Sequence, residues 1–299
     1  MKIKDLKYFV VFLIIISCNE LSRENEFYSS GNIKTLHEYK GNKLLKSTFY
    51  YDNNEIKYKE LFYKSKYDSL VYYYDNGNVF KKGKKNKEGL HFGIWNYYTR
   101  EGYLSNSKEF LLINNSWSKG NWLNQSVYLN KKGDTMYYGN NKFNIYDQEE
   151  FKKESEGEKT SFFVRFHKNN ISDTISISEP FSSIAEDGFP MWEKANSESY
   201  IVLAKEKNNF NSDFSNENTV KLDTFICLEK DKFNQGILPN VNKKHTVVFG
   251  RWFDTPGKKY LRGYMVEHYK RKATPNDSVR GETRRTYFEK IIYVKDTIN

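Results

Sequence analysis

Cysteine and proline are scarce in this chain of 299 residues, which has two cysteines and five prolines. Aromatic residues are abundant instead, at 17% of the chain, with 24 tyrosines and 22 phenylalanines. Tyrosine and phenylalanine favour strands over helices. The composition therefore predicts a mainly β protein.

The motifs of several enzyme classes are missing. The five histidines form no His-x-x-x-His or His-Glu-x-x-His pattern, which excludes a zinc-protease helix. No Gly-x-Ser-x-Gly elbow and no Walker-type phosphate loop occurs. Glu267 and His268 are adjacent, but neighbouring strand residues point to opposite faces and cannot form a local dyad. We predict no catalytic residue, no cofactor and no metal, and keep a glycan hydrolase with carboxylates paired by the fold as an alternative.

Long apolar runs are absent except near the N-terminus, where residues 8–16 form an unbroken stretch of nine. A membrane-spanning helix needs about 20 such residues, so this stretch is too short. It follows a segment with three lysines and precedes a small residue, which is the plan of a secretory signal. The residues Ile15-Ile16-Ser17-Cys18 resemble the lipobox of bacterial lipoproteins, whose cysteine is acylated and becomes the first mature residue. We therefore expect residues 1–17 to be a signal peptide and residues 18–26 to be a tether.

A lipid on Cys18 would place the protein in the cell envelope, anchored to a membrane; we expect the outer membrane, on its periplasmic or surface face. Cys227 would then have no disulfide partner in the chain, and its strand-like surroundings predict a buried, inert thiol. Nucleic acid is not an expected partner of an exported protein, despite a net charge of +10. The charge could lie against anionic lipid or glycan, or form a solvated lysine-rich surface.

Aromatic pairs recur in the first half at spacings of 23, 23 and 24 residues. Each pair precedes a turn-forming segment and then an apolar residue. Asn-Gly and related sequences adopt the positive φ angles that tight hairpin turns require. One hairpin cannot bury its apolar face alone, so the repeat predicts an antiparallel meander of stacked hairpins. The pairs are Phe27-Tyr28, Tyr50-Tyr51, Tyr73-Tyr74 and Tyr97-Tyr98, with a weaker fifth copy over residues 127–135.

Residues 93–104 (GIWNYYTREGYL) and 72–79 (YYYDNGNV) resemble the MORN-repeat variant pattern of a Gly, a Trp, an aromatic pair and a Gly turn. The resemblance covers roughly residues 27–110 and implies a scaffold without catalytic residues. Bacterial proteins with such repeats are often labelled antitoxins, a function that an exported location disfavours. Tyrosines alternating with lysines could form a binding surface, or the rings could pack between hairpins. The candidate surface residues are Tyr51, Tyr74, Trp95 and Tyr98.

A highly charged segment, residues 147–158, reads as a linker between a repeat domain at 27–146 and a second domain at 159–299. The second domain contains seven short strand-like runs, which predict an antiparallel β-sandwich. Residues 280–285 contain the densest arginine cluster, which could contact phosphate or carboxylate; we interpret it as solvated hairpin charge. We thus expect a non-catalytic envelope lipoprotein that binds protein or glycan, with a glycan hydrolase or an antitoxin-like immunity protein as alternatives.

Overall fold

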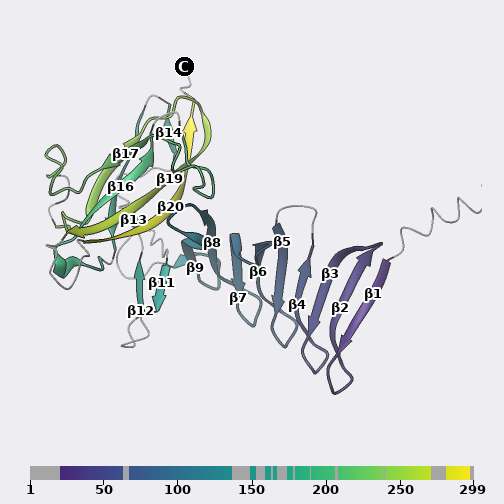
Figure 1. Ribbon diagram of the computed structural model, residues 1–299. Helices are drawn as coiled ribbons and strands as arrows, with labels where there is room; N and C mark the ends of the chain where they lie inside the picture. Colours follow the sequence, from purple (N-terminus) through teal and green to yellow (C-terminus); the bar gives the residue numbers. More distant parts are fainter. Residues whose placement is uncertain are drawn as a thin grey trace, which may run out of the picture. The chain divides into compact units, whose positions relative to one another are not determined.

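The computed structural model describes most of the chain after residue 20 (Figure 1). Cys18, the expected signal peptide and the start of the tether lie outside the described residues. The fold is mainly β, as predicted, and the one short helix described is a 3-10 turn at Glu193–Ala195. The described residues are 21–62, 67–136, 149–152, 159–162, 164–166, 174–177, 179–188, 190–205, 208–236, 238, 240–270 and 281–296.

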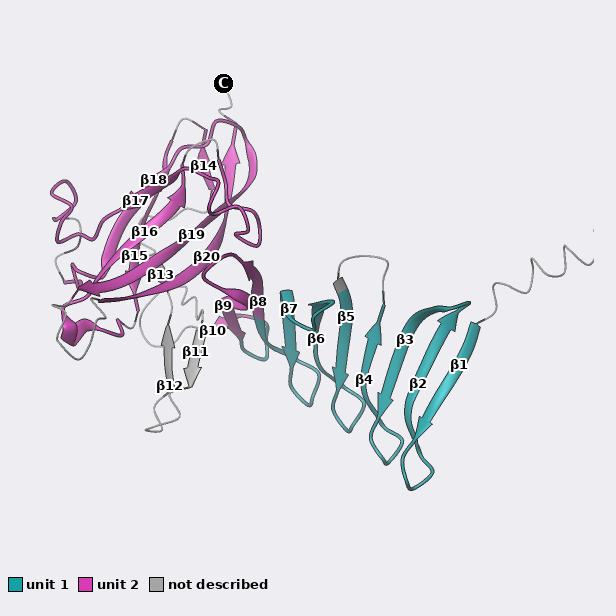
Figure 2. Cartoon of the chain, viewed as in Figure 1, with its two compact units in different colours: residues 1–107, 129–133 teal, residues 108–128, 134–299 magenta. Residues whose placement is uncertain are grey.

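The chain divides into two compact units (Figure 2). Unit 1 consists of residues 1–107 and 129–133, and unit 2 of residues 108–128 and 134–299. This division differs from the predicted boundary after residue 146, because residues 108–128 belong to unit 2. Part of the expected linker also forms a strand, β11 (Glu149–Lys152).

The first ten strands form one sheet in which every strand neighbours the next in sequence, confirming the predicted meander. Pairing from β1 to β7 is antiparallel throughout. The strands are β1 (Leu21–Phe27), β2 (Ile33–Lys40), β3 (Lys43–Tyr50), β4 (Ile56–Leu61), β5 (Tyr67–Tyr73), β6 (Val79–Asn86), β7 (His91–Tyr98), β8 (Leu104–Asn114), β9 (Lys119–Leu129) and β10 (Thr135–Met136).

The repeat is visible in the hydrogen bonds of successive turns. The Tyr74 N–H donates to the carbonyl of Asn78 (2.8 Å), and the Gly77 N–H donates back to the Tyr74 carbonyl (3.1 Å). The same two bonds start at residues 28, 51 and 99. In every copy the residue three positions on has a positive φ, such as +81° at Gly77 and +65° at Asn54. Local turn chemistry therefore sets the hairpin spacing.

Tyrosine hydroxyls connect one turn to the next. The Tyr28 hydroxyl donates to the Tyr50 carbonyl at 2.7 Å, and the Tyr74 hydroxyl donates to the Tyr98 carbonyl at 2.8 Å. These bonds join residues 22 and 24 positions apart, close to the sequence repeat. The second aromatic of a pair therefore links consecutive hairpins.

Unit 2 contains two facing sheets, which confirms the predicted sandwich. One pair, β14–β20, is parallel and was not expected. The sheets share a core that includes Phe181 and Phe249 from the first and Ile201, Met265 and Phe288 from the second. The first sheet is β13 (Val164–Phe166), β15 (Phe181–Asp187) and β18 (Thr246–Arg251); the second is β14 (Thr174–Ser176), β20 (Gly281–Lys295), β19 (Gly257–Lys270), β16 (Glu198–Ala204) and β17 (Leu222–Phe225). A separate pair joins β11 to β12 (Lys159–Phe162).

The β8–β9 hairpin covers the other face of the five-stranded sheet. Leu111 and Trp122 pack in a second core with Phe214, Tyr264 and Tyr287. Residues 201–204 are consecutive in β16 and all at most 4% exposed, as expected for a strand covered on both faces. The segment between β16 and β17 contributes Phe210 and Phe214 to this core at 1% and 0% exposure.

Candidate functional site

The four residues predicted to form a binding surface do not share one. Trp95 is fully buried, stacks on His91 at 3.8 Å and donates from its Nε1–H to the Lys84 carbonyl. Trp95 and Tyr98 also lie on opposite faces of β7, because strand residues alternate. Tyr51 is 37% exposed, and Tyr74 is half-buried with its hydroxyl bonded to Tyr98. Burial therefore removes Trp95 from the candidate surface.

An aromatic row crosses one face of the meander. The strand register places Phe49, Tyr58, Tyr72, Lys81 and Tyr97 directly opposite one another in succession. The rings of Phe49 and Tyr58 stack at 4.1 Å and 14°, and those of Tyr58 and Tyr72 at 5.0 Å and 29°. Rings that stack on each other have little free face for a sugar, which favours the alternative that they pack between hairpins. We call this side the aromatic face.

The opposite side of the same sheet, the basic face, is lysine-rich. The register places two cross-strand rows there. One row is Asn25, Leu36, Thr48, Lys59, Val71, Lys82 and Asn96; the other is Arg23, Glu38, Lys46, Leu61, Ser69, Lys84 and Phe92. Together these rows hold five basic side chains against one acidic side chain, Glu38.

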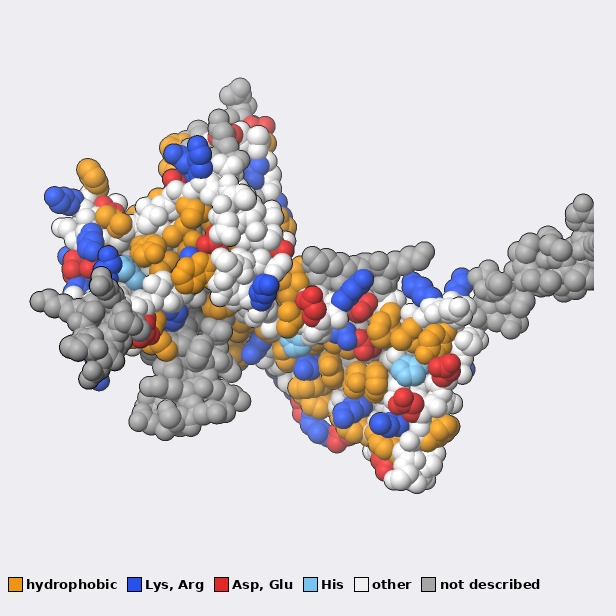
Figure 3. All heavy atoms as spheres, viewed as in Figure 1, with side chains coloured by type: hydrophobic (Ala, Val, Ile, Leu, Met, Phe, Trp, Pro, Cys, Tyr) orange, Lys and Arg blue, Asp and Glu red, His pale blue; other side chains and the backbone are white. Residues whose placement is uncertain are grey.

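The aromatic face has the opposite balance of charge. Three rows across that face hold four acidic and two basic side chains: Glu24, Glu26, Glu60 and Asp68 against Lys81 and Lys85. Figure 3 shows one side of the molecule, where charged side chains of both signs lie among apolar ones. Charge is therefore segregated between the two faces of the unit 1 sheet.

Tyrosines support lysines on the basic face. The Lys59 ammonium lies 5.2 Å from the centre of the Tyr73 ring, and the Lys82 ammonium lies 5.4 Å from that of Tyr98. Such contacts hold the lysine stem against an apolar surface while the charge stays in water. Glu38 is ion-paired with Lys46, whose hydrogen bond is the main cause that lowers the pKa of that carboxyl. The single acid of these rows is thus already paired.

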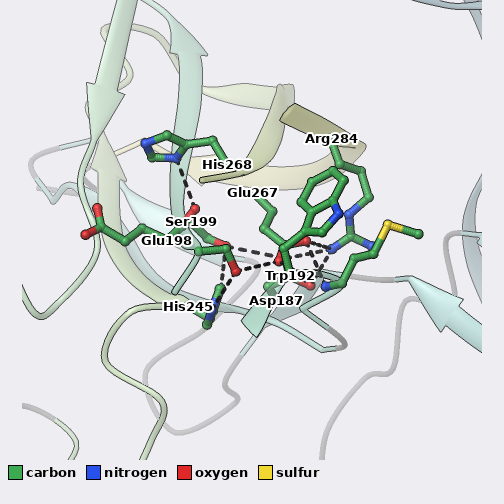
Figure 4. Close-up of polar contacts among 10 residues, drawn as sticks. Asp187, Trp192, Glu198, Ser199, His245, Glu267, His268 and Arg284 are labelled. Atoms are coloured by element: carbon green, nitrogen blue, oxygen red, sulfur yellow. Dashed lines mark hydrogen bonds and ion pairs between the residues drawn. The ribbon is translucent and has the colours of Figure 1, made fainter. Parts of the chain in front are cut away.

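Unit 2 contains a buried ring of polar side chains (Figure 4). The Ser199 hydroxyl lies 2.9 Å from Nδ1 of His245, and the Ser197 hydroxyl lies 3.5 Å from its Nε2. Ser197 also donates to Glu267 at 2.8 Å. The ring closes through the Arg284 guanidinium, which is ion-paired with Asp187 and Glu267 at 2.9 Å each. Its members are Asp187, Ser197, Ser199, His245, Glu267 and Arg284.

This ring has the residue types of a hydrolase, but its serines, histidine and carboxylates are buried. Ser197, Ser199 and His245 are at most 1% exposed, and Glu267 is 1% exposed. Burial raises the pKa of Asp187, an effect that the Arg284 charge partly opposes. Because the Arg284 guanidinium is ion-paired with Asp187 and Glu267, it balances negative charge within the protein. The geometry is that of a cross-link among β15, β16, β19 and β20.

The sequence interpretation of the arginine cluster was wrong for two of its members. The side chains of Arg284 and Arg285 are only 13% and 16% exposed, and Arg285 is ion-paired with Glu217. Glu267 lies directly opposite Arg284 in the β19–β20 register. The sequence feature that could have revealed this ion pair is the presence of opposite charges on β19 and β20, the two strands of one hairpin. His268 points away from this ring and bonds the Glu198 carbonyl, as alternation predicts.

A cleft lies between β17 and β18. Two hollows of about 320 and 390 Å³ meet there, and both are lined by Thr224, Phe225 and Gly250. The hollow of about 320 Å³ is also lined by Asp223 and Arg251. The hollow of about 390 Å³ is also lined by apolar side chains that include Ile226 and Phe233. No member of the buried polar ring lines either hollow.

Within the described part of the chain, no group of histidine, cysteine and acidic residues is arranged to hold a metal ion. No described helix has the length and apolarity needed to cross a bilayer. Cys227 is buried, as expected from the sequence, and burial raises the pKa of its thiol. No protein-family model, curated protein or solved structure matches this chain.

Proposed function

We propose that this protein is a lipid-anchored, non-catalytic envelope module whose basic face lies against an anionic surface of the envelope. The observation that carries the proposal is the segregation of charge between the two faces of the unit 1 sheet. Anionic lipid headgroups and anionic glycans present the same chemistry to such a face. A row of lysines attracts either of them without any specific pocket.

The expected anchor is close in sequence to the first strand of this sheet. Only three residue steps separate Cys18 from Leu21, where β1 begins. Three extended residues span at most about 10 Å. The electrostatic screening length at physiological ionic strength is about 8 Å. A lipid on Cys18 would therefore hold the start of β1 about one screening length from the membrane surface.

The free energy of binding to an anionic membrane can be estimated from the number of exposed lysines on the basic face. A lysine near an anionic membrane contributes about 1 kcal/mol. Lys82 and Lys84 are exposed neighbours in the two basic rows. Replacing both with glutamine should cost about 2 kcal/mol, or roughly a 30-fold loss of binding at low salt.

The test uses the chain from residue 19, which lacks the acylation site and retains every described residue. Its binding is measured with phosphatidylcholine vesicles, with vesicles containing phosphatidylglycerol, and with dextran sulfate as an anionic glycan. We expect salt-sensitive binding to an anionic probe, weakened about 30-fold by Lys82→Gln/Lys84→Gln. The vesicle and dextran arms show which source of negative charge is preferred.

A matched control removes the same charge from unit 2. Lys232 and Lys243 are exposed and lie outside the meander. Lys232→Gln/Lys243→Gln should leave binding nearly unchanged. Equal losses in the two double variants would mean that net charge alone is responsible, and the proposal would fail.

The anchor is tested separately in cells. Cys18→Ser should abolish labelling by palmitate and move the protein to soluble fractions. Persistent labelling and membrane association in this variant would contradict the lipid anchor while leaving the vesicle result unaffected.

A further inference from the structure

The two strands that border the unit 2 cleft direct backbone groups toward it. The Thr246 carbonyl accepts from the Leu228 N–H at 2.8 Å, so the backbone of Thr246 faces the β17 side. Backbone direction repeats every second residue in a strand, so Val248 and Gly250 face the same way. One edge of β18 is paired with β15. Among the described residues, the opposite edge, which faces β17, is paired only at the Cys227–Val247 bridge and through the bonds beside it.

Strand β17 presents a complementary edge. The Lys221 carbonyl accepts from the Lys205 N–H at 2.7 Å, which fixes the alternation along the strand. Asp223 and Phe225 therefore direct their backbone toward β16, and Leu222 and Thr224 direct theirs away from it. The two edges join near Cys227 and separate beyond it, with the two hollows between them.

The cleft also has apolar side chains at its rim. Phe233 is 98% exposed, and Ile226 is 46% exposed. Both line the larger hollow, together with Phe225 and Phe249. Exposed apolar side chains around a concave site are typical of a surface that receives another polypeptide.

The charged lining indicates the chemistry of the occupant. The Arg251 guanidinium is occupied by the Ala204, Lys205 and Asn208 carbonyls. Asp223 lines the same hollow and supplies a negative charge there. The guanidinium donors are directed at those carbonyls, so Asp223 is the group at this end that can accept a bond from a donor side chain such as lysine. A large apolar side chain would complement Phe225 and Phe233 at the other end, which Asp231 also lines.

We propose that the cleft binds an extended segment of a partner protein, inserted as a strand between β17 and β18. Its backbone would bond Thr224 on one side and Gly250 on the other. Its apolar side chain would fill the hollow beside Phe225 and Phe233, and a basic residue would face Asp223. This interaction is distinct from that of the basic face, because it belongs to unit 2 and depends on backbone hydrogen bonds.

The experiment selects binders of the chain from residue 19 out of a displayed library of random peptides about twelve residues long. Selected peptides are synthesised, and their affinities are measured for three proteins: the unchanged chain, Phe233→Asp and Tyr293→Asp. Phe233 and Tyr293 are both exposed aromatic residues in unit 2, so neither change threatens the fold. The Phe233 variant should lose at least tenfold in affinity, and the Tyr293 control should lose little.

Two backbone measurements separate insertion from simple surface binding. Hydrogen exchange of the Gly250 amide should slow when peptide binds. A strand inserted between two strands uses both of its edges, so N-methylation of either the odd or the even peptide residues should abolish binding. Recovery of no binder, affinity that Phe233→Asp leaves unchanged, or tolerance of one N-methylated set would each overturn the proposal. None of these outcomes depends on the vesicle assay or on Cys18.

Discussion

Replacing Trp122 tests whether the β8–β9 hairpin is part of the unit 2 core. The side chain is 9% exposed, lies edge-on to Tyr287 at 5.4 Å and donates to the Tyr287 carbonyl at 3.1 Å. Truncating a buried tryptophan to alanine costs about 3–5 kcal/mol. The loss also leaves the Tyr287 carbonyl without this donor, which adds about 1 kcal/mol. Trp122→Ala should therefore lower the free energy of unfolding of unit 2 by about 4–6 kcal/mol, a large part of a typical domain's stability.

Hydrogen exchange of β20 amides in increasing denaturant reports on unit 2 directly. Trp117→Ala is the matched control, since Trp117 lies on the same hairpin and is 60% exposed. Trp117 stacks over the Arg285 guanidinium at 4.0 Å, so its removal should cost at most about 1 kcal/mol. A Trp122→Ala protein whose β20 exchange matches that of the control would refute the assignment of residues 108–128 to unit 2.

The remaining predictions concern one residue in each unit. In unit 1, Gly83→Ala should destabilise the meander by about 1–3 kcal/mol, because the added Cβ would lie 2.3 Å from the Trp95 ring; an unchanged denaturation midpoint would argue against this packing. In unit 2, burial raises the pKa of Asp187, so folding favours its protonated form. The free energy of unfolding should therefore fall as pH rises from the unfolded pKa through the raised folded pKa. Asp187→Asn should flatten that part of the profile in urea titrations, and a profile as steep as that of the unchanged protein would assign the dependence to another group.

The hairpin repeat could be predicted because its causes are local. Each turn depends on residues within five positions, such as Tyr74, Gly77 and Asn78, whose bonds recur in successive copies. The sequence contains these residues in order, so their spacing predicts the meander. The two-sheet core of the second domain followed in the same way from alternating apolar runs.

The unit boundary could not be predicted because its causes are distant in sequence. The Asn124 side chain bonds both the N–H and the carbonyl of Glu289, 165 residues away, at 2.9 Å each. Nothing near Asn124 distinguishes it from the other asparagines of the repeat. The composition shift at residues 147–158 was a stronger local signal, and it marked a charged segment rather than the division between units.

The buried polar ring escaped prediction for a related reason. Its carboxylates come from β15 and β19, Ser199 comes from β16, and Ser197 and His245 immediately precede β16 and β18. Their sequence separations, up to 97 residues between Asp187 and Arg284, carry no motif. Only Glu267 and Arg284 share a hairpin, and recognising them required the register of that hairpin.

The central claim, that the basic face of unit 1 contacts an anionic surface, is tested most directly by a pair of fluorescent labels. Ser22 and Asn25 are exposed, uncharged residues of β1 that lie on the aromatic and basic faces respectively. An environment-sensitive fluorophore is attached to Ser22→Cys or Asn25→Cys in the chain from residue 19, and phosphatidylglycerol vesicles or dextran sulfate are added. The account predicts a salt-sensitive change in emission at position 25 and little change at position 22. Equal changes at the two positions, or a change confined to position 22, would contradict it.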